Sequence, residues 1–227
     1  MNMKKNISNI ALVVLLPLLL VACGLDNYDA PESTLLGKIT YNGTAVNLRG
    51  TGEAVRLQLY QDGWQQRNPV EVFVGQDGTF SAKLFDGEYK LVTRDNNGPW
   101  VNARDTTVIN LKGTTTVELK VTPYFMISGE QISVSGSEMN ASFVIDQIVP
   151  TATINRVILI LSSTQFADDA NNVFRRDIPD IPAGPVSLKV DISGNANVAN
   201  AKALYGRVGV QTSGVDQAIY SSVIKLR

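Results

Sequence analysis

The feature that most constrains the fold is an alternation of apolar and polar residues that recurs along the chain and is punctuated by turns containing glycine. Across residues 55–60 every second side chain is apolar, which is the period expected of a strand with one buried face. Such segments are separated by dipeptides such as Asp77-Gly78, where glycine readily takes the positive φ of a hairpin turn. No segment after Cys23 shows a convincing helical period. The alternation therefore predicts an all-β protein.

The expected strands fall into two groups. The first group has seven members, at residues 36–41, 55–60, 70–74, 80–84, 89–93, 106–111 and 115–121. The pattern restarts after Thr122-Pro123, and the second group lies at residues 131–134, 141–146, 157–161, 186–192, 204–211 and 218–226, the last two forming a hairpin. Short strands at this spacing are typical of β-sandwiches. We therefore predict two consecutive sandwich domains, at residues 35–123 and, with an immunoglobulin-like architecture, at residues 124–227.

The first 22 residues have the pattern of a signal peptide. Lys4 and Lys5 precede an uncharged segment at residues 10–22, which is too short for a membrane-spanning helix of about 20 residues. The segment ends in Leu-Val-Ala-Cys23, which resembles the bacterial lipobox. The resemblance implies cleavage before Cys23 and acylation of Cys23 as a lipid anchor. The alternative is an ordinary secretory signal followed by a stray cysteine.

Residues 23–34 are then a lipid-anchored tether. This segment carries Asp26, Asp29 and Glu32, an acidic run that resembles the surface-export signal of Bacteroidetes lipoproteins. The resemblance implies an outer-membrane protein, held by its N-terminal acyl chains and facing the cell exterior. The alternative is a solvated tether without a sorting role.

Composition excludes several classes of site. The 227 residues include no histidine and one cysteine, so a Ser-His-Asp or Cys-His nucleophile, a His-ligated metal and an internal disulfide are all ruled out within the chain. The formal net charge is −1, so there is no general positive field to attract nucleic acid. We expect no nucleic-acid partner and no cofactor.

The acidic residues do not suggest catalysis or metal binding. Asp168-Asp169 followed by Asn171-Asn172 offers oxygen atoms for calcium, but the spacing matches no EF-hand loop and adjacent acids in a turn are usually solvated. Glycoside hydrolysis needs two carboxyl groups about 5–10 Å apart in a cleft. Nothing in the sequence brings together any two of the candidates, which are Glu53, Glu71, Asp177 and Asp180. We expect neither a metal site nor an enzyme.

Three motifs carry a family resemblance. Leu36-Gly37-Lys38-Ile39, Asp77-Gly78-Thr79-Phe80 and residues 84–91 resemble the carboxypeptidase-regulatory-like, or transthyretin-like, domain. Together with the lipobox and a second all-β module, they make the chain similar to a two-domain Bacteroidetes lipoprotein family of unknown function, encoded near SusC/SusD-like uptake systems. The resemblance implies an accessory glycan-binding subunit with polysaccharide and SusC/SusD-like partners. The alternative is a non-catalytic structural, adhesin or scaffold lipoprotein that mediates protein–protein contacts.

Two groups of residues are candidates for a glycan site. Trp64 and Trp100 lie in loops rich in amides and charged groups, and a sugar stacks on such a ring. The alternatives are that Trp100 packs between the domains and that Trp64 folds over its own hairpin. The second group lies in the long irregular segment 162–185 and consists of Phe166, Phe174, Arg175 and Arg176. That segment is alternatively an irregular edge strand, capped by prolines, or a short helical turn covering the core.

Overall fold

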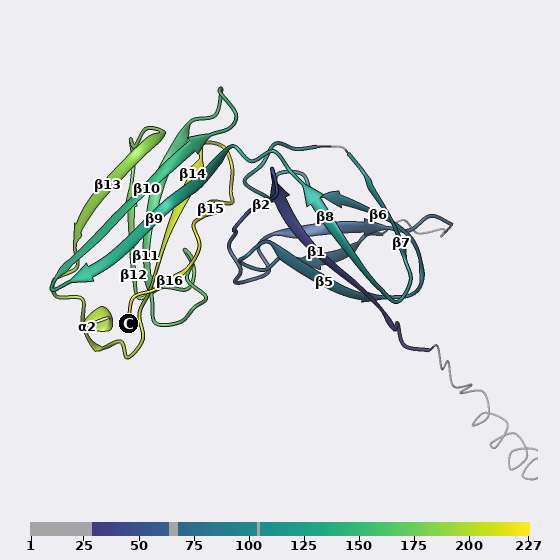
Figure 1. Ribbon diagram of the computed structural model, residues 1–227, viewed down its shortest axis with the longest axis horizontal. Coiled ribbons are helices and arrows are strands. Elements are labelled where there is room, and N and C mark those ends of the chain that lie inside the picture. The colour runs from purple at the N-terminus through teal and green to yellow at the C-terminus, as the bar shows by residue number, and fades with distance from the viewer. Residues whose placement is uncertain (1–28, 64–67, 104) are drawn as a thin grey trace, which may run out of the picture. The chain divides into compact units, whose positions relative to one another are not determined.

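The computed structural model describes residues 29–227, apart from residues 64–67 and 104. Strands dominate these residues, and the sheets form two domains, as the alternation predicts (Figure 1). One short helix in the described residues, α2 (Ala196–Asn200), was not expected. Its N-cap residue Asn195 accepts a hydrogen bond from the Val198 backbone N–H at 3.0 Å, which satisfies a donor that a first turn leaves open. No helix of the described residues is long and apolar enough to cross a membrane.

The first domain contains two four-stranded sheets. Sheet I has the order β2-β1-β5, with β8 pairing parallel to β1, and sheet II has the order β4-β3-β6-β7. The strands of sheet I are β1 (Ser33–Tyr41), β2 (Thr44–Ala45), β5 (Thr79–Leu84) and β8 (Thr114–Lys120). The strands of sheet II are β3 (Arg56–Tyr60), β4 (Val70–Phe73), β6 (Gly87–Thr93) and β7 (Thr107–Leu111). The two-residue strand β2 is an addition to the expected set.

Alternating side chains of both sheets make the core of this domain. Leu35 and Ile39 of β1 and Leu57 and Leu91 of sheet II are fully buried and belong to one hydrophobic cluster. The hairpin turns are built as expected, since Gly78 has a φ of 76°, a conformation that costs glycine little.

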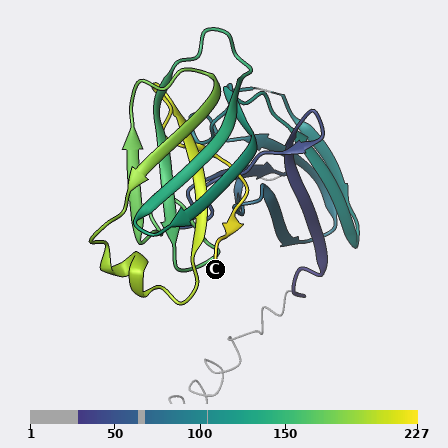
Figure 2. The same ribbon diagram turned by 60° about the vertical axis from the view of Figure 1, so that its left-hand side comes forward.

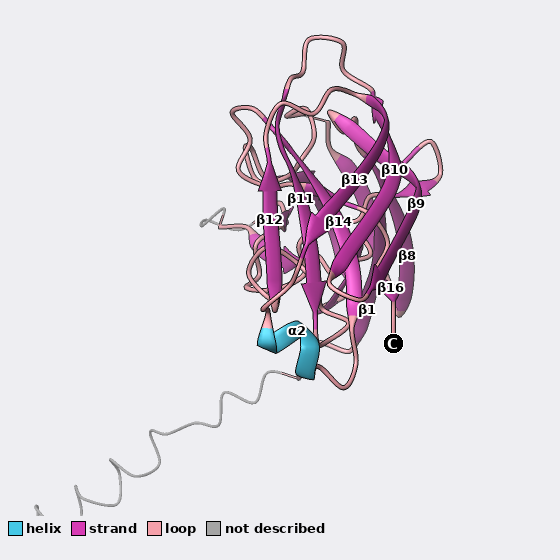
Figure 3. Ribbon diagram, turned by 90° about the vertical axis from the view of Figure 1, so that its left-hand side faces the viewer, coloured by secondary structure: helices cyan, strands magenta, loops and turns pink. Residues whose placement is uncertain are grey.

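The second domain contains the remaining two sheets. Sheet III has the order β13-β10-β9, and sheet IV has the order β12-β11-β14-β15, with β16 also pairing with β14. Figures 2 and 3 show the sheet III strands side by side, with α2 near one end of this domain. The strands of sheet III are β9 (Phe125–Ser135), β10 (Glu138–Gln147) and β13 (Gly184–Asp191). The strands of sheet IV are β11 (Ile154–Ser162), β12 (Phe174–Ile178), β14 (Tyr205–Thr212), β15 (Ile219–Tyr220) and β16 (Ile224–Lys225).

Strand β11 is unusual because both of its faces are covered. Residues 157–161 are all buried, and Ile158 and Ile160 form a second hydrophobic cluster with Ala167, Ala218 and Tyr220 on the face away from the main core. The segment that follows β11 therefore packs back over sheet IV. It continues into β12, which among the described strands pairs with β11 alone. The irregular segment 162–185 therefore contains an edge strand, which was one of the two alternatives for it.

Residues Glu32–Arg227 form one compact unit. Its main hydrophobic cluster includes buried residues of both domains. A backbone hydrogen bond also joins the domains, since the Tyr220 N–H donates to the Asn47 carbonyl at 3.0 Å. The connection at Thr122-Pro123 is further tied to the first domain by a β-bridge between Trp100 and Pro123.

Candidate functional site

The outer face of sheet II is the candidate site. In β3, Leu57 and Leu59 point into the core, so Arg56, Gln58 and Tyr60 point outward. The strand register places Phe73 opposite Arg56, and both Glu71 and Val92 opposite Gln58. Residues that are 13 to 34 positions apart in sequence therefore lie side by side on one surface. We call this surface the sheet II platform, and its residues are Arg56, Gln58, Tyr60, Glu71, Phe73 and Val92.

Contacts among the polar side chains hold the platform in place. The Gln58 Nε2 donates to Glu71 Oε1 at 3.1 Å, and the Tyr60 hydroxyl donates to Gln58 Oε1 at 3.2 Å. The Arg56 guanidinium lies 5.2 Å from the centre of the Phe73 ring, within the range of a cation–π contact. These contacts limit the rotamers of the side chains and so reduce the entropy that a bound ligand would have to remove.

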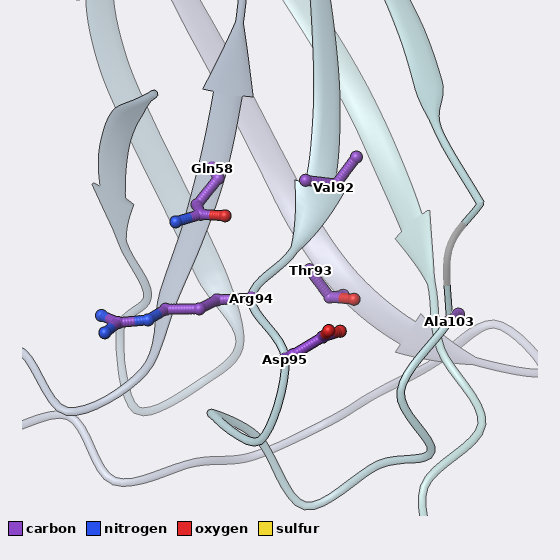
Figure 4. A pocket seen from close by; sticks show the side chains of 6 residues that line it. All are labelled: Gln58, Val92, Thr93, Arg94, Asp95 and Ala103. Atoms are coloured by element: carbon purple, nitrogen blue, oxygen red, sulfur yellow. The ribbon is translucent and has the colours of Figure 1, made fainter. Parts of the chain in front are cut away.

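A cavity of about 400 Å³ adjoins the platform at the end of β6. Its lining residues are Gln58, Val92, Thr93, Arg94, Asp95 and Ala103. Figure 4 shows Gln58 projecting from β3 and the Arg94 side chain extending across that strand, where its Nη1 lies 3.9 Å from Glu71 Oε2. The volume is in the usual range for small-molecule sites, and the lining offers an amide, a hydroxyl, a guanidinium and a carboxylate. The lining therefore offers both hydrogen-bond donors and acceptors, the groups that bind sugar hydroxyls.

The platform also exposes apolar surface. Phe73 is 42% exposed on β4, and Val108 is 53% exposed on β7, facing outward opposite Lys90. An aromatic ring flanked by amides and a guanidinium can stack on the C–H face of a sugar while its neighbours bond the hydroxyls. Sequence reasoning missed this site because it searched the loops for tryptophan. The sequence signal that could have revealed the site is the set of outward-facing residues in β3 and β4. In this set the aromatic residues Tyr60 and Phe73 alternate along the strands with the polar residues Arg56, Gln58 and Glu71.

The two tryptophan candidates have different positions. Trp100 is 2% exposed and belongs to the main hydrophobic cluster, next to Gly98, where an added Cβ would lie 2.2 Å from the ring. Its ring therefore has no open face for a sugar, and Trp100 is a core residue that does not belong to the candidate site. Trp64 lies outside the described residues, as does Cys23.

The second candidate group is dispersed along one segment. Phe166 is 51% exposed, but Phe174 packs against the main cluster. The Arg175 guanidinium makes a two-pronged contact with Asp177, at 2.7 and 2.8 Å, which raises the pKa of Arg175. Arg176 is exposed on the edge strand. Of these four residues, Phe166 alone has an aromatic ring that is largely exposed to solvent. It lies in the second domain, between β11 and β12, and so is not part of the sheet II platform.

Polar groups near Phe166 are engaged in contacts with the first domain. Asp168 is 1% exposed and accepts hydrogen bonds from the Thr51 backbone N–H at 3.1 Å and from the Thr51 hydroxyl at 2.7 Å. Arg207, also 1% exposed, donates to the carbonyls of Gln76, Ala167 and Ser221 at 2.9 to 3.0 Å. Burial lowers the pKa of Arg207 to about 10. Both groups are occupied by structural hydrogen bonds and are not free to bind a ligand.

Tyr220 belongs to the same cluster. Its hydroxyl donates to Asp169 Oδ1 at 2.9 Å, and its ring lies 4.6 Å from the Arg207 guanidinium carbon. Burial, together with the charge of Asp169, raises the pKa of Tyr220, so its hydroxyl stays protonated and keeps donating at ordinary pH. Within the described residues, no cluster of three or more acidic or cysteine ligands suited to a metal ion occurs.

Comparisons with known proteins identify the family. Residues 33–122 match the model of the N-terminal domain of DUF3823, a family of proteins of unknown function. Residues 125–225 match the model of DUF3823_C, a domain of unknown function. A DUF3823 family protein from Parabacteroides merdae is 65% identical, with a TM-score of 0.85 over 88% of this chain and 100% of that chain. A DUF3823 family protein from Bacteroides ovatus is 30% identical, with a TM-score of 0.78 over 86% of this chain and 98% of that chain.

A more distant structure shares the fold. A putative carbohydrate binding protein from Bacteroides uniformis is 16% identical, with a TM-score of 0.71 over 87% of this chain and 99% of that chain. The comparison with curated proteins found no match. The two domain matches span nearly all of residues 33–225, and the chain therefore belongs to the DUF3823 family.

Proposed function

We propose that this protein is a non-catalytic, outer-membrane surface lipoprotein that binds polysaccharide as an accessory subunit of a SusC/SusD-like uptake system. The observation that carries the proposal is the sheet II platform, with its exposed Phe73, its pre-positioned Gln58 and the adjoining cavity. The distant relative from Bacteroides uniformis, a putative carbohydrate binding protein, adds support. The proposed partner comes from the family resemblance. The chain has motifs that resemble the transthyretin-like domain, and similar lipoproteins are encoded near SusC/SusD-like systems.

Polysaccharide binding is tested by affinity gel electrophoresis of residues 25–227, a form that retains the whole compact unit. We expect at least one polysaccharide from a plant and host panel to retard the wild-type protein. Phe73→Ala should relieve the retardation because it removes the stacking ring, with an affinity loss of about fivefold to tenfold.

A matched control is available in the same domain. Phe85 is 53% exposed and lies in the turn between β5 and β6, so Phe85→Ala should leave retardation unchanged. Phe166→Ala tests the exposed ring of the second domain in the same gel. Loss of retardation in Phe166→Ala alone would move the site to the second domain. Absence of retardation on the whole panel would overturn glycan binding.

The anchor is tested separately. Cys23→Ser should abolish incorporation of radiolabelled palmitate and move the protein from the membrane fraction to the soluble fraction, because acyl chains supply about 0.8 kcal/mol of membrane affinity per buried CH₂. Proteinase K added to intact cells should digest the wild-type protein. Protection of the protein until the outer membrane is opened would place it in the periplasm and contradict the surface location.

A second candidate function is that of a scaffold that mediates protein–protein contacts. The buried hydrogen bonds of Asp168 and Arg207 to Thr51 and Gln76 join the two domains into one unit, which suits a rigid spacer but identifies no partner. Pull-down with the acylated protein from outer-membrane extract distinguishes the two functions. Capture of a SusC/SusD-like protein by the wild type and by Phe73→Ala alike, without any retardation by polysaccharide, would favour the scaffold.

A further inference from the structure

The charges at the sheet II platform and its cavity cancel. The platform and its cavity carry two guanidinium groups, from Arg56 and Arg94, and two carboxylates, from Glu71 and Asp95, and Arg94 Nη1 lies 3.9 Å from Glu71 Oε2. The neighbouring Lys90 is already paired with Asp62 at 2.5 Å. A surface without excess positive charge gains nothing from a row of carboxylates or sulfates, because each added anion would meet an acid as often as a base. Charge complementarity therefore favours an uncharged ligand.

The order of the strands favours an elongated ligand. Sheet II ends in β4 on one side and in β7 on the other, and neighbouring strands lie about 4.8 Å apart, so a path across all four strands is roughly 14 Å long. Phe73 on β4 and Val108 on β7 are exposed apolar groups at the two edges. The registers set Phe73 beside Arg56 and Val108 in the row of Lys90 and Tyr60, four residues further along β3. The line that joins them therefore crosses the strands obliquely and is roughly 20 Å long. The amide of Gln58, on β3, lies between them and is held by Glu71, which lies on β4 beside Phe73. A ligand that crosses the strands meets apolar contacts at both edges and hydrogen-bonding groups in the middle.

Both edges of this path are strands at the border of the sheet, so a chain can leave the face on either side. A site for a chain end would need a wall that closes around the terminal unit, as enclosed pockets do. Here, the hollow that adjoins the platform lies beside β3 at the end of β6, strands that are not at the border of the sheet (Figure 4).

Resting on the proposed function, we infer that the sheet II platform binds the interior of an extended, uncharged polysaccharide that crosses the strands from β4 to β7. Phe73 and Val108 contact the C–H faces of sugar units near the two edges. Gln58, Arg94 and Asp95 bond the hydroxyls of a unit that lies over the cavity. Neither chain end contacts the protein in this arrangement.

The test is isothermal titration of residues 25–227 with oligosaccharides of increasing length, cut from the neutral polysaccharide that gives retardation. We expect affinity to rise from the disaccharide upward and then to level off once the chain spans the face. Reduction of the reducing end with borohydride should leave affinity unchanged. Raising ionic strength from about 0.05 M to about 0.5 M should also leave it unchanged, because screening weakens interactions between charges and hardly affects stacking or neutral hydrogen bonds.

Two variants place the ligand. Gln58→Ala should weaken binding about tenfold, since it removes the central amide and the partner of Glu71, and Val108→Ser should weaken binding only of oligosaccharides long enough to reach β7. Gln131→Ala, an exposed glutamine on β9, is the matched control and should bind like the wild type.

The outcomes separate this inference from the function on which it rests. Full affinity for a mono- or disaccharide, loss of binding after end reduction, or binding confined to uronate polysaccharides and abolished by salt would each overturn the inference while leaving glycan binding intact. If Gln58→Ala and Phe73→Ala both bind with the affinity of the wild type, the inference is likewise overturned while glycan binding stands. A wild-type protein that no polysaccharide retards would overturn both.

Discussion

At the residue scale, the burial of Trp100 changes what its substitution should do. The ring is 2% exposed and lies against Gly98, so Trp100→Ala leaves a cavity in the core. We expect a loss of about 3–5 kcal/mol of unfolding free energy, measured by urea denaturation. Trp100→Phe should cost less, because it keeps a ring and removes an indole N–H that has no hydrogen-bond partner in the described residues. A fully stable Trp100→Ala that lost polysaccharide binding would restore Trp100 as a ligand residue.

A second residue-scale prediction concerns Asp77 in the turn before β5. Burial alone would raise the pKa of Asp77, but hydrogen bonds from the Thr79 hydroxyl and N–H, at 2.6 and 3.2 Å, outweigh it and lower the pKa below its usual range. The folded state therefore favours the carboxylate. This contribution is fully present above the unfolded pKa of about 3.9 and is lost as pH falls through the lower folded pKa.

The measurement compares Asp77→Ala with the wild type at two pH values. The variant should be less stable by up to about 1 kcal/mol at pH 7, and the difference should shrink at pH 3. Asp216→Ala, at an exposed turn position, is the control and should show no such change. A deficit of equal size at both pH values would contradict a role for the ionised carboxylate.

At the element scale, the pairing of β1 with β5 explains why a glycine opens the first motif. Gly37 lies opposite Phe80, and a Cβ added at Gly37 would lie 2.1 Å from Cζ of that ring. Phe80 is 4% exposed, so the ring covers the glycine and cannot swing into solvent without losing its burial. The Gly-x-Ile and Gly-x-Phe motifs are therefore two halves of one cross-strand contact.

Gly37→Ala is accordingly expected to destabilise the protein by about 1–3 kcal/mol through overpacking, measured by thermal unfolding. The adjacent Leu36→Ala, at an outward position that is 40% exposed, should cost less. The double variant Gly37→Ala/Phe80→Leu should recover part of the loss, because the smaller side chain leaves room for the added methyl group. Additive losses in the double variant would show that the two residues are not coupled.

At the scale of the whole molecule, Arg207 links loops of both domains. It donates to Gln76 in the first domain and to Ala167 and Ser221 in the second. Arg207→Met keeps much of the volume but leaves three carbonyls without their donor, so we expect a loss of about 3 kcal/mol or more. Arg176→Met replaces an exposed arginine in the same sheet and should stay within about 0.5 kcal/mol of the wild type. Calorimetry checks both, and equal melting temperatures for Arg207→Met and the wild type would contradict the prediction.

Local sequence determined the all-β fold class, the positions of most strands and turn positions such as Asp77-Gly78. The alternation of apolar and polar residues indicates which side chains of a strand are buried, and a dipeptide such as Asp77-Gly78 indicates a turn with positive φ. Both signals are local, so strands such as β3, β6 and β14 lie close to where the alternation placed them. The same reasoning missed α2, which has five residues, because so short a helix carries no detectable period.

Only the tertiary structure decided where the candidate site lies. Gln58, Glu71 and Val92 meet through the register of three strands, and register depends on pairing between segments that are distant along the chain. Burial of Trp100 and coverage of both faces of β11 depend likewise on what packs against them. An aromatic residue in a polar loop has the same local sequence whether its ring faces solvent or the core, and packing between distant segments makes that choice.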